Sequence, residues 1–313
     1  MMILILGNEL DIHAAHLERV LTHMGISVAY WDTQCFPTQT QLTWCPNTQQ
    51  GCLTLSTGQQ LNLQDIRSVF WRNFSGVSVP MLADATQQHI AFRDATSTLR
   101  SIVQACPAHW VNSWQAYQFH QTKPLQLAMA QRLGVKIPAT LISNSPAQID
   151  EFVRSQHRSH TRVIFKPVCG GAHTQFVTPE HLEPERLQQA LRLAPITIQA
   201  YIPGTNVRTY VVGESIYAAE IRSQAIDFRA DAQAQLISID LPEAIQQQCQ
   251  AIAKAFFLEW TAIDWRVSPA GDYLFLEANP SPMFLHFEQQ TGYPITQQLI
   301  ELLCSTPEEK LRG

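Results

Sequence analysis

Apolar and polar positions in the first thirty residues follow the order strand, helix, strand. Residues 2–6 form an apolar run that predicts a buried strand, and residues 11–24 carry apolar side chains at helical spacing up to a stop at Gly25. Residues 26–30 predict a second strand. A helix that joins two strands favours a parallel α/β layer. A nicotinamide site is not expected, because Gly7 alone of the three fingerprint glycines is present.

The same periodicities continue along the chain. Strands are expected over residues 54–63 (with a turn at Gly58), 66–71, 135–142, 162–166, 197–201, 207–212 and 216–221. Helices are expected over residues 87–104, 121–133, 145–154, 186–193, 243–257 and 295–303. On the helix over 121–133, we expect the packed face to consist of Leu125, Ala128, Met129 and Leu133. With 313 residues, the chain is long enough for two or three domains of α/β class.

Two short strands near the C-terminus carry acidic and amide side chains. Residues 261–267 and 272–279 predict an antiparallel hairpin. Glu277 and Asn279 share one face because alternate residues of a strand do, and a symmetric hairpin places Asp264 opposite Glu277. Two carboxylates at ~5 Å repel each other. A divalent cation would remove that repulsion, and two carboxylates with an amide oxygen suit Mg²⁺.

The simpler interpretation of this hairpin is a pair of surface carboxylates neutralised by cations such as Arg266. Against it, the neighbours Ile263, Trp265 and Leu276 are strongly apolar, so both strands are expected to be central. A buried carboxylate without a partner is costly. We therefore favour the metal site.

Two lysines occupy positions that suit phosphate binding. Lys166 ends an apolar strand before a loop with Gly170 and Gly171, where backbone amides can approach phosphate oxygens. Lys123 begins a helix whose free N–H groups can also hold an anion. Each lysine has a simpler interpretation as a solvated side chain.

Three further groups of residues leave binding and structural interpretations open. The segment Gln199-Ala-Tyr-Ile202 offers main-chain groups to a purine edge, or is an ordinary linking strand. Arg208, Arg222 and Arg229 suit carboxylates and phosphates, and one of the three is expected to make only a surface ion pair. Residues 71–74, Trp-Arg-Asn-Phe, could grip a substrate, although an aromatic core is the commoner use.

Composition excludes several classes of function. The chain is 45% hydrophobic and 15% charged, as in ordinary globular proteins. Its net charge of −5 argues against binding to duplex nucleic acid. No apolar run reaches ~18 residues, so no membrane segment is expected. The seven scattered cysteines fit reduced thiols in a cytoplasmic protein.

Taken in order, these segments resemble the ATP-grasp superfamily of carboxylate–amine ligases over essentially the whole chain. The segments that carry the resemblance are Lys123–Thr140, Ile164–Pro167, Ile198–Gly204, Val207–Gly213, Ala262–Asp264 and Phe275–Pro280. Within the superfamily, the chain looks most like the RimK-type branch, and in particular the microviridin-type (graspetide) peptide-cyclising ligases. That likeness lies in Phe70–Arg72, residues 219–224, residues 227–229 and the tail over residues 288–295.

The resemblance implies an ATP-grasp fold in three parts. These are an N-terminal pre-ATP-grasp α/β domain over residues 1–112, a small central lid over 113–196 and a C-terminal α+β domain with the metal site over 197–313. The chain departs from the pattern of the family it resembles at two positions. Ala200 stands where the hinge usually carries glutamate, and Asn206 stands where it usually carries aspartate.

The implied site binds ATP and Mg²⁺. The metal ligands are Asp264, Glu277 and Asn279, and the residues that orient the carboxylate or stabilise the acylphosphate are Arg208 and Arg222. The residues that contact the nucleotide are Lys123, Lys166, Gly170, Gly171, Gln199, Ala200, Tyr201 and Ile202.

The implied activity is ADP-forming ligation of a carboxylate to an amine or hydroxyl through an acylphosphate, on a peptide such as a ribosomal precursor. One alternative is a ligase for free amino acids or a small metabolite. Another is a non-catalytic nucleotide-binding module. No nucleic-acid or membrane partner is expected, and a homodimer is an expectation from the family.

Overall fold

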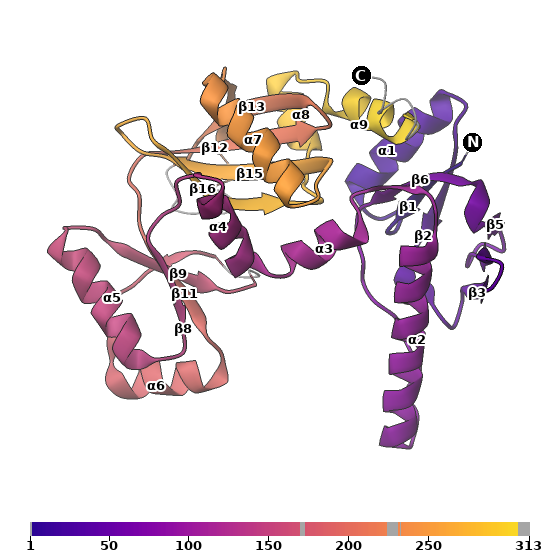
Figure 1. Ribbon diagram of the computed structural model, residues 1–313, viewed down its shortest axis with the longest axis horizontal. Helices are drawn as coiled ribbons and strands as arrows, with labels where there is room; N and C mark the ends of the chain where they lie inside the picture. The colour runs from indigo at the N-terminus through magenta and orange to yellow at the C-terminus, as the bar shows by residue number, and fades with distance from the viewer. Residues whose placement is uncertain (1, 170–172, 224–230, 232, 306–313) are drawn as a thin grey trace.

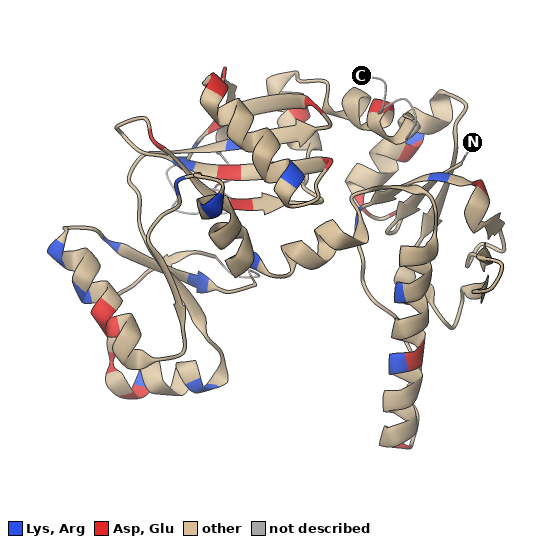
Figure 2. Ribbon diagram, in the orientation of Figure 1, with Lys and Arg blue, Asp and Glu red and all other residues tan. Residues whose placement is uncertain are grey.

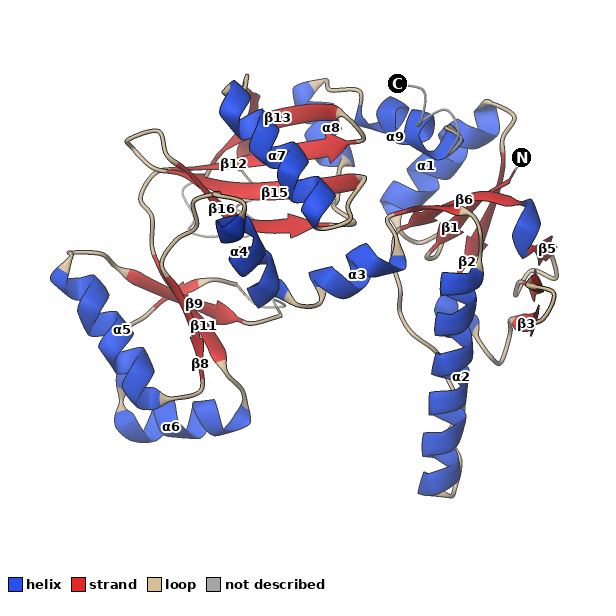
Figure 3. Cartoon of the chain, viewed as in Figure 1, coloured by secondary structure: helices blue, strands red, loops and turns tan. Residues whose placement is uncertain are grey.

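A computed structural model describes residues 2–169, 173–223, 231 and 233–305 of the chain (Figure 1). The predicted nucleotide-loop residues Gly170 and Gly171 lie outside the described residues, as does the segment with Arg229. The described part is a mixed α/β structure built on four sheets, so the predicted fold class is confirmed. Figure 3 shows helices lying against the sheets.

The first sheet is parallel, as the opening of the sequence predicts. Its order is β2-β1-β6-β7, with β1 (Met2–Leu6), β2 (Ser27–Trp31), β6 (Ile66–Trp71) and β7 (His109–Val111). Apolar residues on both faces of these strands bury the sheet between helices. One face packs against α1 (Ile12–His23) and α9 (Ile295–Cys304), and the other against α2 (Ala85–Ala105). Helix α9, the last one in the described part of the chain, thus returns to the first sheet (Figure 1).

Beside α2 lies a small antiparallel sheet of β3 (Gln41–Cys45), β4 (Gln50–Thr54) and β5 (Gln60–Asn62). Gly58 takes a positive φ of 85° in the loop between β4 and β5, where the sequence predicts a turn. Single-turn 3₁₀ helices cover Thr33–Cys35, Leu63–Asp65 and Pro179–Leu182.

A second four-stranded sheet carries the two predicted nucleotide segments. Its order is β10-β9-β11-β8, with β8 (Thr140–Ser143), β9 (Val163–Pro167), β10 (Gln175–Phe176) and β11 (Ile196–Ala200). Helices α5 (Pro146–Arg158) and α6 (Pro184–Leu193) pack on it through a small apolar cluster. The predicted domain division at residues 196 and 197 falls inside β11.

The largest sheet is antiparallel and follows the order β14-β13-β12-β15-β16. Its strands are β12 (Thr205–Val212), β13 (Ser215–Arg222), β14 (Gln235–Ser238), β15 (Trp260–Val267) and β16 (Tyr273–Asn279). Helix α7 (Glu243–Ala255) packs on one face. Residues of α8 (Leu285–Thr291) and α9 pack with the other face, so one core links this sheet to the first.

Two helices, α3 (Trp114–His120) and α4 (Lys123–Arg132), connect the first sheet to the rest (Figure 1). The predicted packed face of α4 is wrong: Leu125 is 54% exposed and Leu133, which follows the helix, 39%. Gln126 is buried instead, because its amide pairs with both main-chain groups of Ala278 on the edge strand β16. A polar side chain that satisfies a strand edge can thus outweigh an apolar stripe.

No helix in the described ranges combines the length and apolar character that a bilayer crossing requires. All seven cysteines are free thiols.

His13 on α1 predicts an acid-sensitive contact between the two ends of the chain. Its ring is 4% exposed, and its Nδ1 lies 3.3 and 3.4 Å from the main-chain N–H donors of Phe284 and Leu285. Nδ1 must therefore be unprotonated. Burial, helped by the nearby Arg72 guanidinium, lowers the pKa of His13 to about 4.

Between about pH 6.5 and pH 4, the unfolded chain binds a proton at His13 that the folded chain excludes. As the pH is lowered from about 6.5 to 4, the free energy of unfolding should therefore decrease, by up to roughly 3 kcal/mol. We expect a His13→Gln variant, which keeps an acceptor but does not titrate, to lose this part of the pH dependence in urea denaturation. Equal slopes for both proteins would contradict the assignment.

Candidate functional site

The paired acidic residues lie where the sequence predicts them. Asp264 on β15 is the direct partner of Glu277 on β16, while Glu277 and Asn279 share a face two residues apart. The hairpin is not symmetric, however, because the register shifts beyond Asp264 and Trp265 pairs with Phe275. This bulge at Leu276 sends Phe275 and Ala278 into the core with α7 and leaves Glu277 on the other face.

Each carboxylate of the pair is held by a cation from another element. Arg208 on β12 donates from Nε and Nη2 to the two oxygens of Asp264, at 2.7 and 2.8 Å. Lys123, the first residue of α4, donates from Nζ to Glu277 Oε2 at 2.6 Å. Asn279 Nδ2 donates to the other oxygen of Glu277 at 3.3 Å. Figure 2 shows the acidic positions on β15 and β16 side by side in the large sheet.

These contacts fix the charge states. Burial alone would raise the pKa of Glu277, but the ammonium of Lys123, then Lys166 and the Asn279 amide, lower it to about 2. Burial would lower the pKa of Arg208, and the carboxylate of Asp264 raises it instead. Glu277 is therefore ionised at neutral pH, and each carboxylate of the site is paired with a basic side chain.

The donor set fits magnesium in its chemistry. Two carboxylates and one amide oxygen are hard oxygen ligands, few enough to leave positions for water and phosphate. Each ionised carboxylate has about four lone-pair sites, so an ion pair does not exhaust it. Within the part of the chain that the structure describes, no three His, Cys, Asp or Glu side chains form a metal cluster by themselves. The ligand set thus depends on Asn279 and on a bound phosphate.

The residues of the second sheet that the sequence predicts to contact the nucleotide are positioned by β11, which lies between β8 and β9. Gln199 is 1% exposed, accepts a weak hydrogen bond from Lys166 Nζ at 3.5 Å and donates to Thr140 Oγ1 at 2.8 Å. The N–H groups of Ala200 and Tyr201 donate to the carbonyl oxygens of Ala139 and Arg162, the residues directly before β8 and β9. Main-chain donation to a purine from Ala200 or Tyr201 would therefore require breaking a bond within the sheet.

The hinge after β11 is fixed by Arg266. Its Nε donates to the carbonyl oxygen of Ile202 at 2.8 Å, Nη1 to Asn206 Oδ1 at 3.0 Å and Nη2 to the Tyr201 hydroxyl at 3.1 Å. Gly204 takes a φ of +130°, and a Cβ there would lie 1.9 Å from the carbonyl oxygen of Val267. Asn206 therefore holds Arg266, and Arg208 is oriented by Asp264 rather than by the hinge.

The two predicted arginines are not brought together. Arg222 ends β13 on the strand face opposite to Arg208, since Arg208 pairs with Ala219. The Arg222 side chain is 61% exposed and lies 3.3 Å from Glu220. Its predicted catalytic role remains a prediction.

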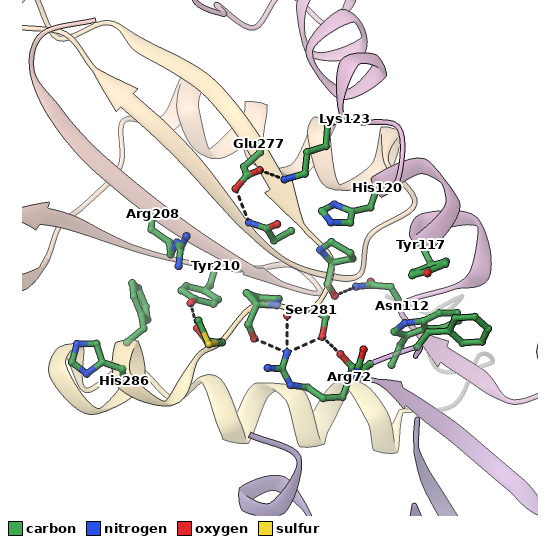
Figure 4. Close-up of a pocket in the computed structure, with 18 of the residues that line it drawn as sticks. Arg72, Asn112, Tyr117, His120, Lys123, Arg208, Tyr210, Glu277, Ser281 and His286 are labelled. Carbon is green, nitrogen blue, oxygen red and sulfur yellow. Dashed lines mark hydrogen bonds and ion pairs between the residues drawn. The ribbon is translucent and has the colours of Figure 1, made fainter. Parts of the chain in front are cut away.

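A cavity of about 870 Å³ lies beside the charged residues, between the first sheet and the largest one. Figure 4 shows Lys123, Arg208 and Glu277 at this cavity, along with side chains that the sequence did not single out. Those are Asn112, Tyr117, His120, Tyr210, Ser281 and His286. The sequence does hold one indication of the helix that carries Tyr117 and His120. Ser113 is a typical N-cap residue, and in the structure it caps α3 by accepting from the Ala116 N–H.

Arg72 and Asn112 join the two sheets at this cavity. Arg72, with a side chain 8% exposed, donates to both oxygens of Asp11 and to the carbonyl and hydroxyl oxygens of Ser281. Asn112 is 2% exposed and bonds four main-chain groups at the ends of β15 and β16. These contacts position the loop that follows Asn279.

Two family models match the chain. Residues 120–303 match the RimK-like ATP-grasp domain, and residues 2–118 match the MvdD pre-ATP grasp domain. A probable alpha-L-glutamate ligase from Picosynechococcus sp. is 28% identical over 201 residues, which span 61% of this chain and 66% of that protein.

Solved structures agree with these matches. The macrocyclase MdnC from Microcystis aeruginosa MRC, bound with precursor peptide MdnA, is 28% identical with a TM-score of 0.84, over 98% of this chain and 100% of that one. The ATP-grasp ligase PsnB, complexed with a phosphomimetic variant of its minimal precursor, Mg and ADP, is 26% identical with a TM-score of 0.78, over 96% and 97%. The ATP-grasp fold expected from the sequence is confirmed.

Proposed function

The chain belongs to the RimK-like ATP-grasp family, and we propose that it is an ATP-dependent ligase that joins a peptide carboxylate to an amine or a hydroxyl. The observation that carries the proposal is that Lys123, Arg208, Glu277 and Asn279 line one cavity, with Asp264 paired to Arg208 beside them. Such a set suits transfer of a phosphoryl group, which requires alignment and charge neutralisation more than covalent help.

The reaction has two steps. A substrate carboxylate oxygen attacks the γ-phosphorus of ATP, which gives an acylphosphate and releases ADP. An amine or hydroxyl then attacks the acyl carbon, loses a proton and displaces phosphate. Mg²⁺ held by Asp264, Glu277 and Asn279 would neutralise phosphate charge. Lys123 and Lys166 would bind phosphate oxygens, and Arg208 would orient the carboxylate. The hinge residues Gln199 to Ile202, with Arg266 behind them, would hold the base through groups other than the N–H donors of Ala200 and Tyr201, which are already bonded.

A peptide substrate is supported by the neighbours, since MdnC and PsnB were both solved with precursor peptides. The cavity of about 870 Å³ has room for several residues of such a chain. We place the reaction in the cytoplasm, where the seven free thiols would stay reduced. The division into three domains and the homodimer stay predictions.

An ADP-release assay tests the proposal. We expect ADP to form with ATP, Mg²⁺ and hexapeptides that contain a glutamate together with a lysine or a threonine, and the peptide to lose the mass of one water. ADP release with free glutamate but with none of the peptides would favour the ligase for small metabolites. ATP binding without turnover on any acid would refute the proposal and favour a non-catalytic module.

A further inference from the structure

The cavity has a second end of different chemistry. Its lining includes three aromatic side chains: Trp71, the last residue of β6, Phe74, which follows that strand, and Tyr117 of α3. In Figure 4, Tyr117 lies across the cavity from Arg208 and near His120. Neither the phosphate chemistry nor the metal chemistry of the proposed function uses these three rings.

The three rings, called here the aromatic wall, form a tight cluster. The ring centroids of Trp71 and Tyr117 are 4.8 Å apart in a stacked arrangement, and Phe74 lies 5.5 Å from each of them. Trp110 and Trp114 pack against Trp71 from behind, at 5.7 and 6.0 Å. This support makes the wall preorganised, so a ligand would not have to order it.

The wall is partly open. Trp71 is 4% exposed, and the rings of Phe74 and Tyr117 are half-buried. Half-exposed rings at a cavity gain free energy when an apolar side chain covers them. An aromatic occupant gains the most, because it combines a large buried area with offset or edge-on ring contacts.

The charges around the cavity indicate what accompanies that occupant. Among the described residues that line it, three are always cationic (Arg72, Lys123 and Arg208) and two are acidic (Asp231 and Glu277). A cationic side chain bound at the wall would be repelled by the cations that line the cavity, such as Lys123. A neutral ring would not be repelled. A substrate carboxylate is drawn to the cationic end.

From this arrangement we propose that the aromatic wall is a side-chain subsite, which holds an aromatic residue next to the acidic residue whose carboxylate is activated. The inference rests on the proposed function, because it takes the charged end of the cavity as the place where the carboxylate reacts. Neighbouring Cα atoms are 3.80 Å apart, so a peptide can place its carboxylate at one end and the flanking ring at the other.

Peptides that differ at one position test the subsite. The probes are hexapeptides with a central glutamate flanked on one side by Phe, Leu or Gly, and a second set with the order reversed. Their affinities are measured by calorimetry with a non-hydrolysable ATP analogue and Mg²⁺, and their KM values by ADP release. We expect the best Phe peptide to bind about tenfold more tightly than its Gly counterpart.

Two variants and a control locate the preference. Phe74→Ala, and Phe74→Leu in case the first is unstable, should reduce the preference for Phe to about threefold or less while the KM for ATP stays the same. Phe92→Ala is the control, because Phe92 lies on α2, is 48% exposed and is not among the described residues that line the cavity. It should keep the preference.

Equal affinities for the Phe, Leu and Gly peptides in the unaltered protein would overturn the inference. So would an equal loss of preference in the Phe92→Ala variant. Binding is measured without turnover, so the subsite is tested even if no peptide releases ADP. Peptide binding with the expected preference but without any ADP release would count against the proposed function alone.

Discussion

Glu277→Gln should lower kcat for ATP-dependent ligation by at least about 100-fold, with little change in the fold. The substitution keeps the shape of the side chain and removes the negative charge that lies 2.6 Å from Lys123. A neutral amide is a poorer ligand for Mg²⁺ than a carboxylate. The side chain of Lys123 is 25% exposed, so its ammonium can turn to water when its partner is lost.

The same experiment at Asp264 is harder to interpret. Arg208 is held by both oxygens of Asp264 and is largely buried, at 17% side-chain exposure. Asp264→Asn would remove the charged partner that both of these bonds depend on, and breaking a buried pair typically costs about 3–5 kcal/mol. A loss of activity there mixes catalysis with stability. Glu277→Gln separates them better.

The matched control is Asp272→Asn, at the residue directly before β16. Asp272 pairs with Lys136 on the surface, and both side chains are about half-exposed or more. Its loss should change kcat less than about twofold, because exposed pairs contribute little. ADP release measured over a range of Mg²⁺ concentrations gives both kcat and the metal requirement. Full activity in Glu277→Gln would refute the metal role.

Local pattern predicts much of this fold. The spacing of apolar residues locates β1, α1 and β2, and the alternation in the last hairpin places Glu277 and Asn279 on one face, as observed. These segments are determined by neighbours within a few residues, where the periods of 2 and 3.6 apply directly. Short elements such as β7 and α3 carry too few residues for a period to show.

Long-range contacts explain the remaining differences. The partner of Glu277 is Lys123, which lies 154 positions away in the sequence, and the buried face of α4 is set by the edge of β16. Asp264 faces Glu277 through a bulge rather than through a symmetric turn. Neither an ion pair between distant elements nor a single-residue bulge leaves a local signal in the sequence.

Asn112→Ala should destabilise the protein by about 3 kcal/mol or more, which is the largest stability effect we expect from one uncharged side chain. The amide Nδ2 donates to the carbonyl oxygens of Trp260 and Pro280, each at 2.6 Å. Its Oδ1 accepts from the N–H groups of Glu259 and Trp260, at 2.8 and 3.1 Å. Alanine would leave these groups without the amide in a site that is 2% exposed.

Asn112→Asp distinguishes hydrogen bonding from packing. Aspartate has the same size and keeps two acceptors, but it loses both N–H donors and brings a charge to two carbonyl oxygens. If the four bonds matter, Asp should destabilise at least as much as Ala; if only volume matters, Asp should be harmless.

Thermal unfolding followed by circular dichroism measures the difference, with Asn62→Ala as control. Asn62 is exposed and makes one side-chain bond, to Asp65 at 2.9 Å, so its loss should cost within about 0.5 kcal/mol. Because Asn112 fixes the ends of β15 and β16, its loss should also lower ligation before the protein unfolds.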